Sequence, residues 1–212
     1  MDNIESKELF NQVRSAHRLL AAYYQRIFQL LTDVTGDERL GLNYYLWEPS
    51  GFLRPCQKQT NVFNRSAWDL LPGMNTNYLF HNAKDNNKQQ SGEWMLDMCV
   101  IADTGTHDNQ NLDPLEDALA LKILPENANS VLRCYFFTAH KETDLNWYDG
   151  LWNAYPYEEC SDEKTPKCID EEQQLYTSSF EVSLDELTGE NAKELLVEKI
   201  MQFKGALLKA ES

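Results

Sequence analysis

Apolar residues recur at alternating steps of three and four through the first part of the chain, which is the spacing of one helical face. The members of this stripe are Phe10, Val13, His17, Leu20, Tyr24, Ile27, Leu31 and Val34. The pattern predicts one helix of about thirty residues, opened by a capping box of Asp2 and Glu5 and stopped near Gly36. We expect this helix to cross a sheet, with His17 at a core or edge position. A protruding end that pairs with a second copy is the alternative.

A second helix is predicted at the end of the chain, with Thr188 as its cap. Its apolar stripe consists of Ala192, Leu196, Ile200, Phe203 and Leu207. Glutamates stand early in this segment and lysines late, as the helix dipole favours. The segment is typical of a helix that packs on a core.

Between the two helices the pattern changes to strands, with β-branched, aromatic or alternating runs bounded by turn residues. The predicted strands are 42–47, 78–81, 93–102, 130–139 and 174–182. Residues 66–71 are typical of one helical turn, and 115–124 fits either a short helix or a strand. The sequence therefore predicts a single α+β domain over residues 1–212, in which a mainly antiparallel sheet of about five strands is covered by the two helices.

The chain has 212 residues and a formal net charge of −15, which disfavours nucleic acid or anionic lipid as a direct ligand. From residue 142 to 198 there are 16 acids against 3 bases, so most of the excess lies in one quarter of the chain. No apolar run approaches the ~18–20 residues that a membrane span needs. The chain begins with acidic and polar residues, unlike a signal peptide, so we expect a cytoplasmic protein.

The five cysteines favour the reduced state, because their number is odd and Cys99 and Cys134 stand within apolar runs. Cys160 and Cys168 bracket a short loop, and whether they pair stays open. Their spacing matches none of the usual zinc motifs. We expect no metal and no cofactor.

One short motif resembles a catalytic loop. Asp103 opens an Asp-Thr-Gly-Thr run after an apolar strand, and this run is similar to the active-site loop of aspartic proteases. A second Asp-Thr-Gly or Asp-Ser-Gly, which a two-lobed enzyme of that family requires, is absent from the sequence. We therefore expect a strand that ends in a turn, and no catalytic residue is assigned.

The segment that favours binding is an acidic, aromatic-rich insertion at about 142–173. Large rings interleaved with carboxylates are typical of a protein interface, where the rings supply contact area and the charges steer the partner. The candidate partner-binding residues are Asp144, Trp147, Tyr148, Asp149, Trp152, Tyr155, Tyr157, Glu158 and Glu159. Alternatively, the rings only pack the insertion onto the body, and the spacing of the two tryptophans suggests that one of them is buried.

These observations favour a non-catalytic protein, such as an inhibitor, an immunity-type protein or an adaptor, that binds the basic surface of another protein. A sensory module with a small-molecule pocket between sheet and helix is the alternative hypothesis. A hydrolase with a site near Asp103 is a third, weaker one. Whether the chain is an enzyme is left open. A homodimer through the N-terminal helix is compatible with the pattern.

Overall fold

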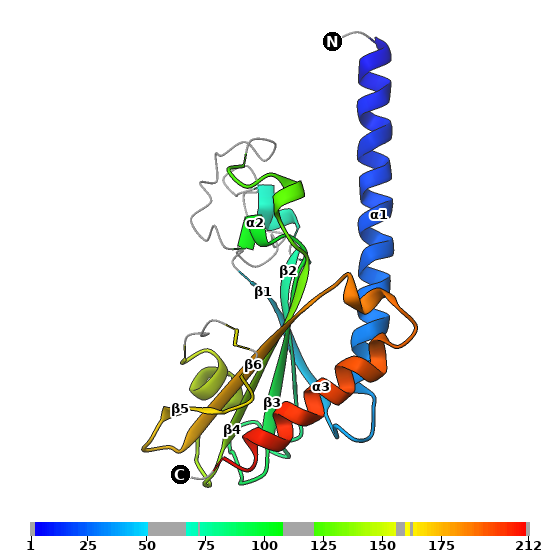
Figure 1. Ribbon diagram of the computed structural model, residues 1–212. Helices are drawn as coiled ribbons and strands as arrows, with labels where there is room; N and C mark the ends of the chain where they lie inside the picture. Colours follow the sequence, from blue (N-terminus) through cyan, green and yellow to red (C-terminus); the bar gives the residue numbers. More distant parts are fainter. Residues whose placement is uncertain are drawn as a thin grey trace.

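The computed structural model describes residues 3–50, 67–71, 73–107, 121–155, 160–161 and 163–210 (Figure 1). The elements in chain order are α1 (Asn3–Thr35), β1 (Asn43–Pro49), the 3-10 turn η2 (Ala67–Leu70), β2 (Asn75–His81), β3 (Trp94–Ile101), α2 (Thr104–His107), the 3-10 turn η3 (Pro125–Asn127), β4 (Val131–Ala139), the π-helix η4 (Trp147–Trp152), β5 (Lys167–Asp170), β6 (Leu175–Ser183), the 3-10 turn η5 (Glu186–Thr188) and α3 (Ala192–Leu207).

The strands form a six-stranded sheet in the order β1-β2-β3-β4-β6-β5, and every neighbouring pair is antiparallel. This arrangement confirms the predicted α+β class and all five predicted strands. The sixth, β5, was not predicted because it is only four residues long and lies at the sheet edge, where a polar sequence is tolerated. The predicted insertion at 142–173 therefore supplies an edge strand. Residues 115–120 lie outside the described residues, and 121–124 form neither helix nor strand.

Both faces of the central strands are buried, which explains why β3 is apolar along its whole length. Alternate residues of each strand enter two separate clusters. One face packs against α1 and α3 through Phe80, Trp94, Leu96, Met98, Val100, Leu132, Phe136, Phe180 and Val182. The other face packs against the segment around η4 through Leu79, Met95, Cys99, Ile101, Tyr135, Phe137 and Leu175.

The C-terminal helix α3 lies along the first face of the sheet, and its predicted stripe is buried throughout. The predicted cap is wrong, because Thr188 belongs to η5 and the N-cap position of α3 is Asn191. The side chain of Asn191 makes no capping hydrogen bond. The turn η5 changes the direction of the chain before α3 begins, so the helix starts four residues after Thr188.

The N-terminal helix α1 is present as predicted and ends at Thr35, next to Gly36. Only its C-terminal half packs on the body, where Ile27, Leu31 and Val34 are buried. The rest stands free of the body (Figure 1), so the expectation that the whole helix crosses the sheet is wrong. His17 is exposed rather than at a core or edge position. The capping residue Asp2 lies outside the described residues.

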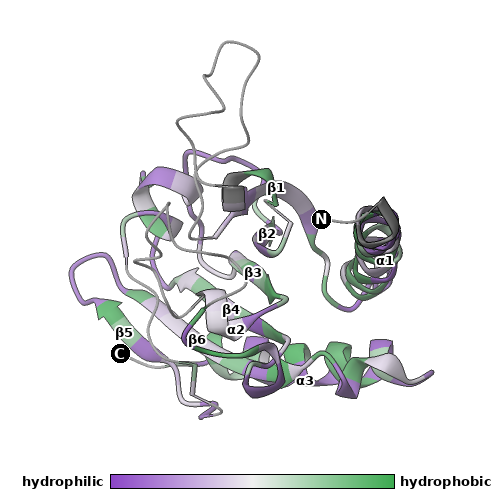
Figure 2. Cartoon of the chain, turned by 90° about the horizontal axis from the view of Figure 1, so that it is seen from above, coloured by the Kyte–Doolittle hydropathy of each residue, from purple (hydrophilic) through white to green (hydrophobic). Residues whose placement is uncertain are grey.

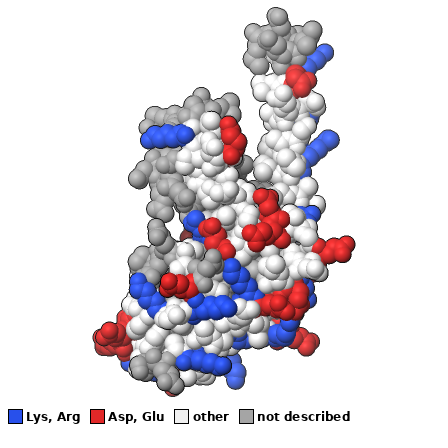
Figure 3. Space-filling view, in the orientation of Figure 1, with Lys and Arg blue, Asp and Glu red and all other residues white. Residues whose placement is uncertain are grey.

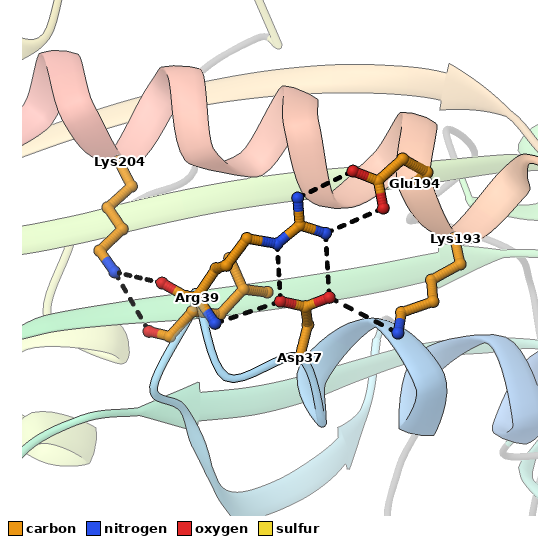
Figure 4. Close-up of polar contacts among 6 residues, drawn as sticks. Asp37, Arg39, Lys193, Glu194 and Lys204 are labelled. Carbon is orange, nitrogen blue, oxygen red and sulfur yellow. Dashed lines mark hydrogen bonds and ion pairs between the residues drawn. The ribbon is translucent and has the colours of Figure 1, made fainter.

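A cluster of ion pairs joins the end of α1 to the start of α3 (Figure 4). The Arg39 guanidinium donates to both carboxylate oxygens of Glu194, at 2.8 and 2.9 Å, and to Asp37 at 2.8 Å. Lys193 approaches Asp37 at 3.5 Å, and Lys204 donates to the backbone oxygen of Arg39 at 3.2 Å. Hydrogen bonds from Arg39 lower the pKa of both carboxyl groups, so these contacts persist well into the acid range. The cluster links the loop that follows α1 to the first turn of α3.

Candidate binding groove

An apolar groove of about 550 Å³ lies between α1 and the end of the sheet formed by the edge strand β1 and its neighbour β2. Its volume falls in the range of ordinary ligand sites, ~300–1,000 Å³. Seen from above (Figure 2), α1 stands end-on beside this edge of the sheet. The groove is lined by Tyr24, Phe28, Leu31, Thr32, Thr35, Tyr44, Trp47, Gly73, Tyr78 and Phe80.

A β-bulge in β1 directs two aromatic side chains into the groove. Tyr44 pairs with Phe80 and Trp47 pairs with Tyr78, and the register shifts between Tyr44 and Leu46. In a regular strand, residues three apart point to opposite faces. The extra residue of the bulge places Tyr44 and Trp47 on the same face. Both rings remain accessible, with 57% of Tyr44 and 45% of Trp47 exposed.

The rings of the groove contact one another across the two elements. Phe28 lies edge-on to Tyr78 with centroids 6.1 Å apart, and Tyr24 stacks on Phe28 at 6.4 Å. Burial raises the pKa of Tyr78 to about 12 and also raises the pKa values of Tyr24 and Tyr44. All three phenols are therefore neutral at physiological pH, so the groove presents uncharged rings.

Gly73 and Tyr24 lie next to each other in one part of the groove wall. A Cβ atom on Gly73 would stand 3.0 Å from the Tyr24 ring, closer than side-chain carbons normally approach. The absence of a side chain at this position lets the ring lie flat against the turn that precedes β2. A larger residue at position 73 would force the Tyr24 ring to move.

The acidic, aromatic-rich segment lies on the opposite face of the sheet. Trp147 and Trp152 are both buried, at 0% and 7% exposed, and belong to the core of that face. The Trp147 indole donates to the Lys88 backbone oxygen at 3.1 Å, and the Trp152 indole donates to the Asp97 carboxylate at 2.8 Å. Both rings attach the segment to the body, so neither offers an accessible anchor to a partner in this conformation.

The remaining candidates of this segment divide into anchored and exposed residues. Tyr148 is half-buried, stacks on Trp152 and donates to Glu48 of β1. Tyr155 donates to Asp170 at 2.8 Å. Asp144 and Asp149 are exposed. Tyr157, Glu158 and Glu159 lie outside the described residues.

Several titratable groups are buried beneath this segment. The His81 ring stacks on Trp147 at a centroid distance of 5.7 Å and is tilted against Tyr45 at 4.7 Å, and burial lowers its pKa. Burial also raises the pKa of the Cys99 thiol on this face and of the Cys134 thiol on the opposite face, under α1 and α3, which keeps both protonated. These groups are therefore held in their neutral forms within the core.

The other chemical candidates have structural roles in the described chain. Asp103 accepts a hydrogen bond from the Gly105 backbone at 2.8 Å and starts the short helix α2 after β3 ends. Cys160 and Cys168 are free thiols, as are Cys99 and Cys134. Within the described residues, no group of three or more His, Cys, Asp or Glu side chains is arranged to hold a metal ion. The search for a helix long and apolar enough to cross a membrane found none in the same part of the chain.

Comparison with known proteins identifies one family. The model of the PM0109 family matches residues 3–205, which covers α1, the whole sheet, the groove and all but the last two residues of α3. The chain belongs to the PM0109 family. Within that family it is similar to the "Uncharacterized protein PM0109" of Pasteurella multocida (strain Pm70), with 27% identity over 155 residues. The aligned region covers 69% of this chain and 68% of that relative. No solved structure matches the chain.

The sequence analysis of this PM0109-family chain offered a pocket between sheet and helix as an alternative but assigned no residues to it, because the walls of the groove come from segments far apart in sequence. Tyr24 was assigned to the apolar stripe, and Tyr44 and Trp47 fell within a predicted strand. The bulge was not visible in the run Tyr44-Tyr45-Leu46-Trp47, in which every residue is apolar or aromatic. The available signal was the run of four consecutive apolar or aromatic residues. A strand with one polar face would instead alternate apolar and polar residues.

Proposed function

We propose that this protein is a non-catalytic binding protein that engages another protein at the aromatic groove. The observation that carries the proposal is the exposure of large rings in the groove. Three of the eleven large apolar side chains exposed in the described chain, Phe28, Tyr44 and Trp47, line it together. Contiguous exposed apolar surface of this kind marks protein interaction sites. Tyrosine and tryptophan are also the residues that most often anchor such contacts.

The proposed partner offers an apolar segment with basic residues beside it. The groove accepts the apolar side chains, since its tyrosines are neutral. Acidic groups stand close by on the other side of β1, where Glu48 accepts from Tyr148. Asp149 is near enough to raise the pKa of Tyr45, in addition to the larger effect of burial. The acidic segment then steers a basic partner toward β1, and the rings of the groove hold it.

The test compares Trp47→Ala with Leu195→Ala. Leu195 is equally exposed, at 43%, but lies on α3 and does not line the groove. The wild-type protein and both variants are used as bait in extracts of the source cells, bound proteins are identified by mass spectrometry, and the affinity of each purified candidate is then measured by calorimetry. We expect Trp47→Ala to weaken binding by about 2 kcal/mol, or about 30-fold, and Leu195→Ala to leave it unchanged.

Recovery of a protein does not by itself support the proposal, which requires the loss of binding in Trp47→Ala. A partner that binds Trp47→Ala and Tyr44→Ala with wild-type affinity would show that the groove is not the contact surface. Thermal unfolding of each variant serves as the control for folding, and we expect little change because both side chains are largely exposed.

A small apolar molecule is the second candidate occupant, favoured by the volume of the groove and its aromatic walls. Native mass spectrometry of the purified protein distinguishes the two. A bound molecule that is absent from Trp47→Ala would support the sensory module. A partner protein whose affinity depends on Trp47 would support the binding protein.

A further inference from the structure

The free half of α1 carries an apolar seam that nothing in the described chain covers. Every side chain from residue 7 to 19 is exposed, including Phe10 at 59% and Val13 at 42%. Figure 3 shows this half rising above the body with a largely uncharged surface. An isolated helix of this length is marginally stable in water, and such a helix is normally covered by packing along its apolar face.

The spacing of the seam indicates what covers it. From Phe10 to Val34 the apolar stripe alternates steps of three and four without a break, which is a strict repeat of 3.5 residues. A 3.5-residue repeat is typical of a left-handed coiled coil, in which the two seams pack as knobs into holes. Ile27, Leu31 and Val34 use the seam to pack on the body. The expected cover for the free part is a second helix.

The protein exposes more surface than a compact chain of the same mass. A compact monomer of 24.6 kDa has an accessible surface of about 10,100 Å². The surface of this chain is 13109 Å², and the free half of α1 contributes to the excess. A stable dimer needs to bury only about 800 Å² on each partner.

The position of the body decides the direction of the second helix. The seam of the free half continues the face of α1 that packs on the body. In a parallel pair each body would therefore lie toward the shared axis at the same end, and the two bodies would occupy the same space. In an antiparallel pair the bodies lie at opposite ends and do not meet.

We propose that a second copy of this chain covers the free half of α1, and that the two helices form an antiparallel coiled coil centred between Phe10 and Val13. Phe10 of each copy packs against Val13 of the other, and Ser6 of each lies opposite His17. This register is the longest that ends before Ile27, which already packs on the body. The inference is independent of the proposed function, because it uses the other half of α1.

The first test measures the mass of the full-length protein by sedimentation velocity over a concentration series. We expect a dimer for the wild type and a dissociation constant at least about 100-fold higher for Val13→Glu, since the change buries an unpaired charge in both copies. Leu19→Glu is the matched control, because Leu19 is 72% exposed but lies off the seam. A monomeric wild type, or equal weakening by the two changes, would overturn the proposal.

The second test reads the direction of the helices from cysteine cross-linking. Ser6→Cys and His17→Cys are prepared separately, and we expect mild oxidation to give a cross-linked dimer only when the two variants are mixed. Wild-type protein controls for the native cysteines. Cross-linking of either variant alone would indicate a parallel pair and contradict the proposed geometry.

The same variants separate this inference from the proposed function. We expect Trp47→Ala to remain dimeric and Val13→Glu to bind the partner protein at the groove. If instead the wild type is monomeric and Val13→Glu abolishes partner binding, the seam belongs to the partner site and the dimer proposal fails.

Discussion

Trp47 and Trp152 have the same side chain but lie in opposite environments, one exposed and one buried. Trp152 is 7% exposed and donates to the buried carboxylate of Asp97, whereas Trp47 is 45% exposed and lines the groove. Both stand among aromatic and acidic neighbours in the sequence. The difference comes from the bulge in β1 and from the way η4 packs on the sheet, and neither feature is local to the tryptophan.

Trp152→Phe should destabilise the fold, whereas Trp47→Phe should not. The first change keeps a ring in place but leaves the Asp97 carboxylate without the indole donor, which costs about 1–3 kcal/mol for a buried acceptor. The second replaces one largely exposed ring by another, and its effect should stay within about 0.5 kcal/mol. Urea denaturation followed by circular dichroism measures both. Equal stabilities would show that the Trp152–Asp97 bond contributes nothing.

The helix α1 is one element with two roles. Its last turns complete the core through Ile27, Leu31 and Val34, and the Arg39 cluster ties its end to α3. Its first turns contact nothing in the described chain that buries their side chains. The continuous stripe predicts a single helix correctly but does not indicate where the body ends.

Two truncations separate these roles. Removal of residues 1–20 should leave a protein with a cooperative thermal transition, because no buried side chain of the described chain is lost. Removal of residues 1–34 should give molten or insoluble protein, because it exposes the face of the sheet that Ile27, Leu31 and Val34 cover. Differential scanning calorimetry distinguishes the two outcomes. A cooperative transition in the longer truncation would show that α1 is dispensable for folding.

The acidic charge of the whole molecule is concentrated in residues 142–198, but part of it is neutralised within the fold. Glu181 pairs with Arg133 at 2.7 Å, and Glu194 pairs with Arg39 at 2.8 Å. Asp144 also pairs with Lys88, at 3.4 Å, but its side chain and that of Asp149 are exposed beside the η4 segment, so both are better placed to act on a partner at a distance. The sequence count therefore overstates the charge available for steering.

Neutralising Asp144 and Asp149 together should slow association with a partner that binds at the groove. We expect Asp144→Asn with Asp149→Asn to lower the association rate and its dependence on salt, with little change in the dissociation rate. Glu186→Gln with Glu190→Gln is the control, because it removes the same charge from exposed positions before α3. Biolayer interferometry over a salt series gives both rates. Equal association rates for the two double variants would contradict steering by this segment.

The candidate site was less predictable than the fold. The acidic, aromatic composition of 142–173 predicts a partner-binding segment with one buried tryptophan, and it did not indicate that both tryptophans face inward. Burial of Trp147 depends on the loop at Lys88, and burial of Trp152 depends on Asp97 in β3. Both partners are more than fifty residues away, and no short window of sequence contains such contacts.

The sequence by itself determined the two long helices, five of the six strands and the α+β class, because hydrophobic periodicity is a local property that each segment carries alone. Only the tertiary structure decided that half of α1 stands free, that the bulge turns Tyr44 and Trp47 into one groove, and that Trp147 and Trp152 are buried. Each of these depends on which segments meet across the sheet. Burial is a relation between distant residues, so a stripe or a ring in the sequence shows what can be covered, and the fold decides what covers it.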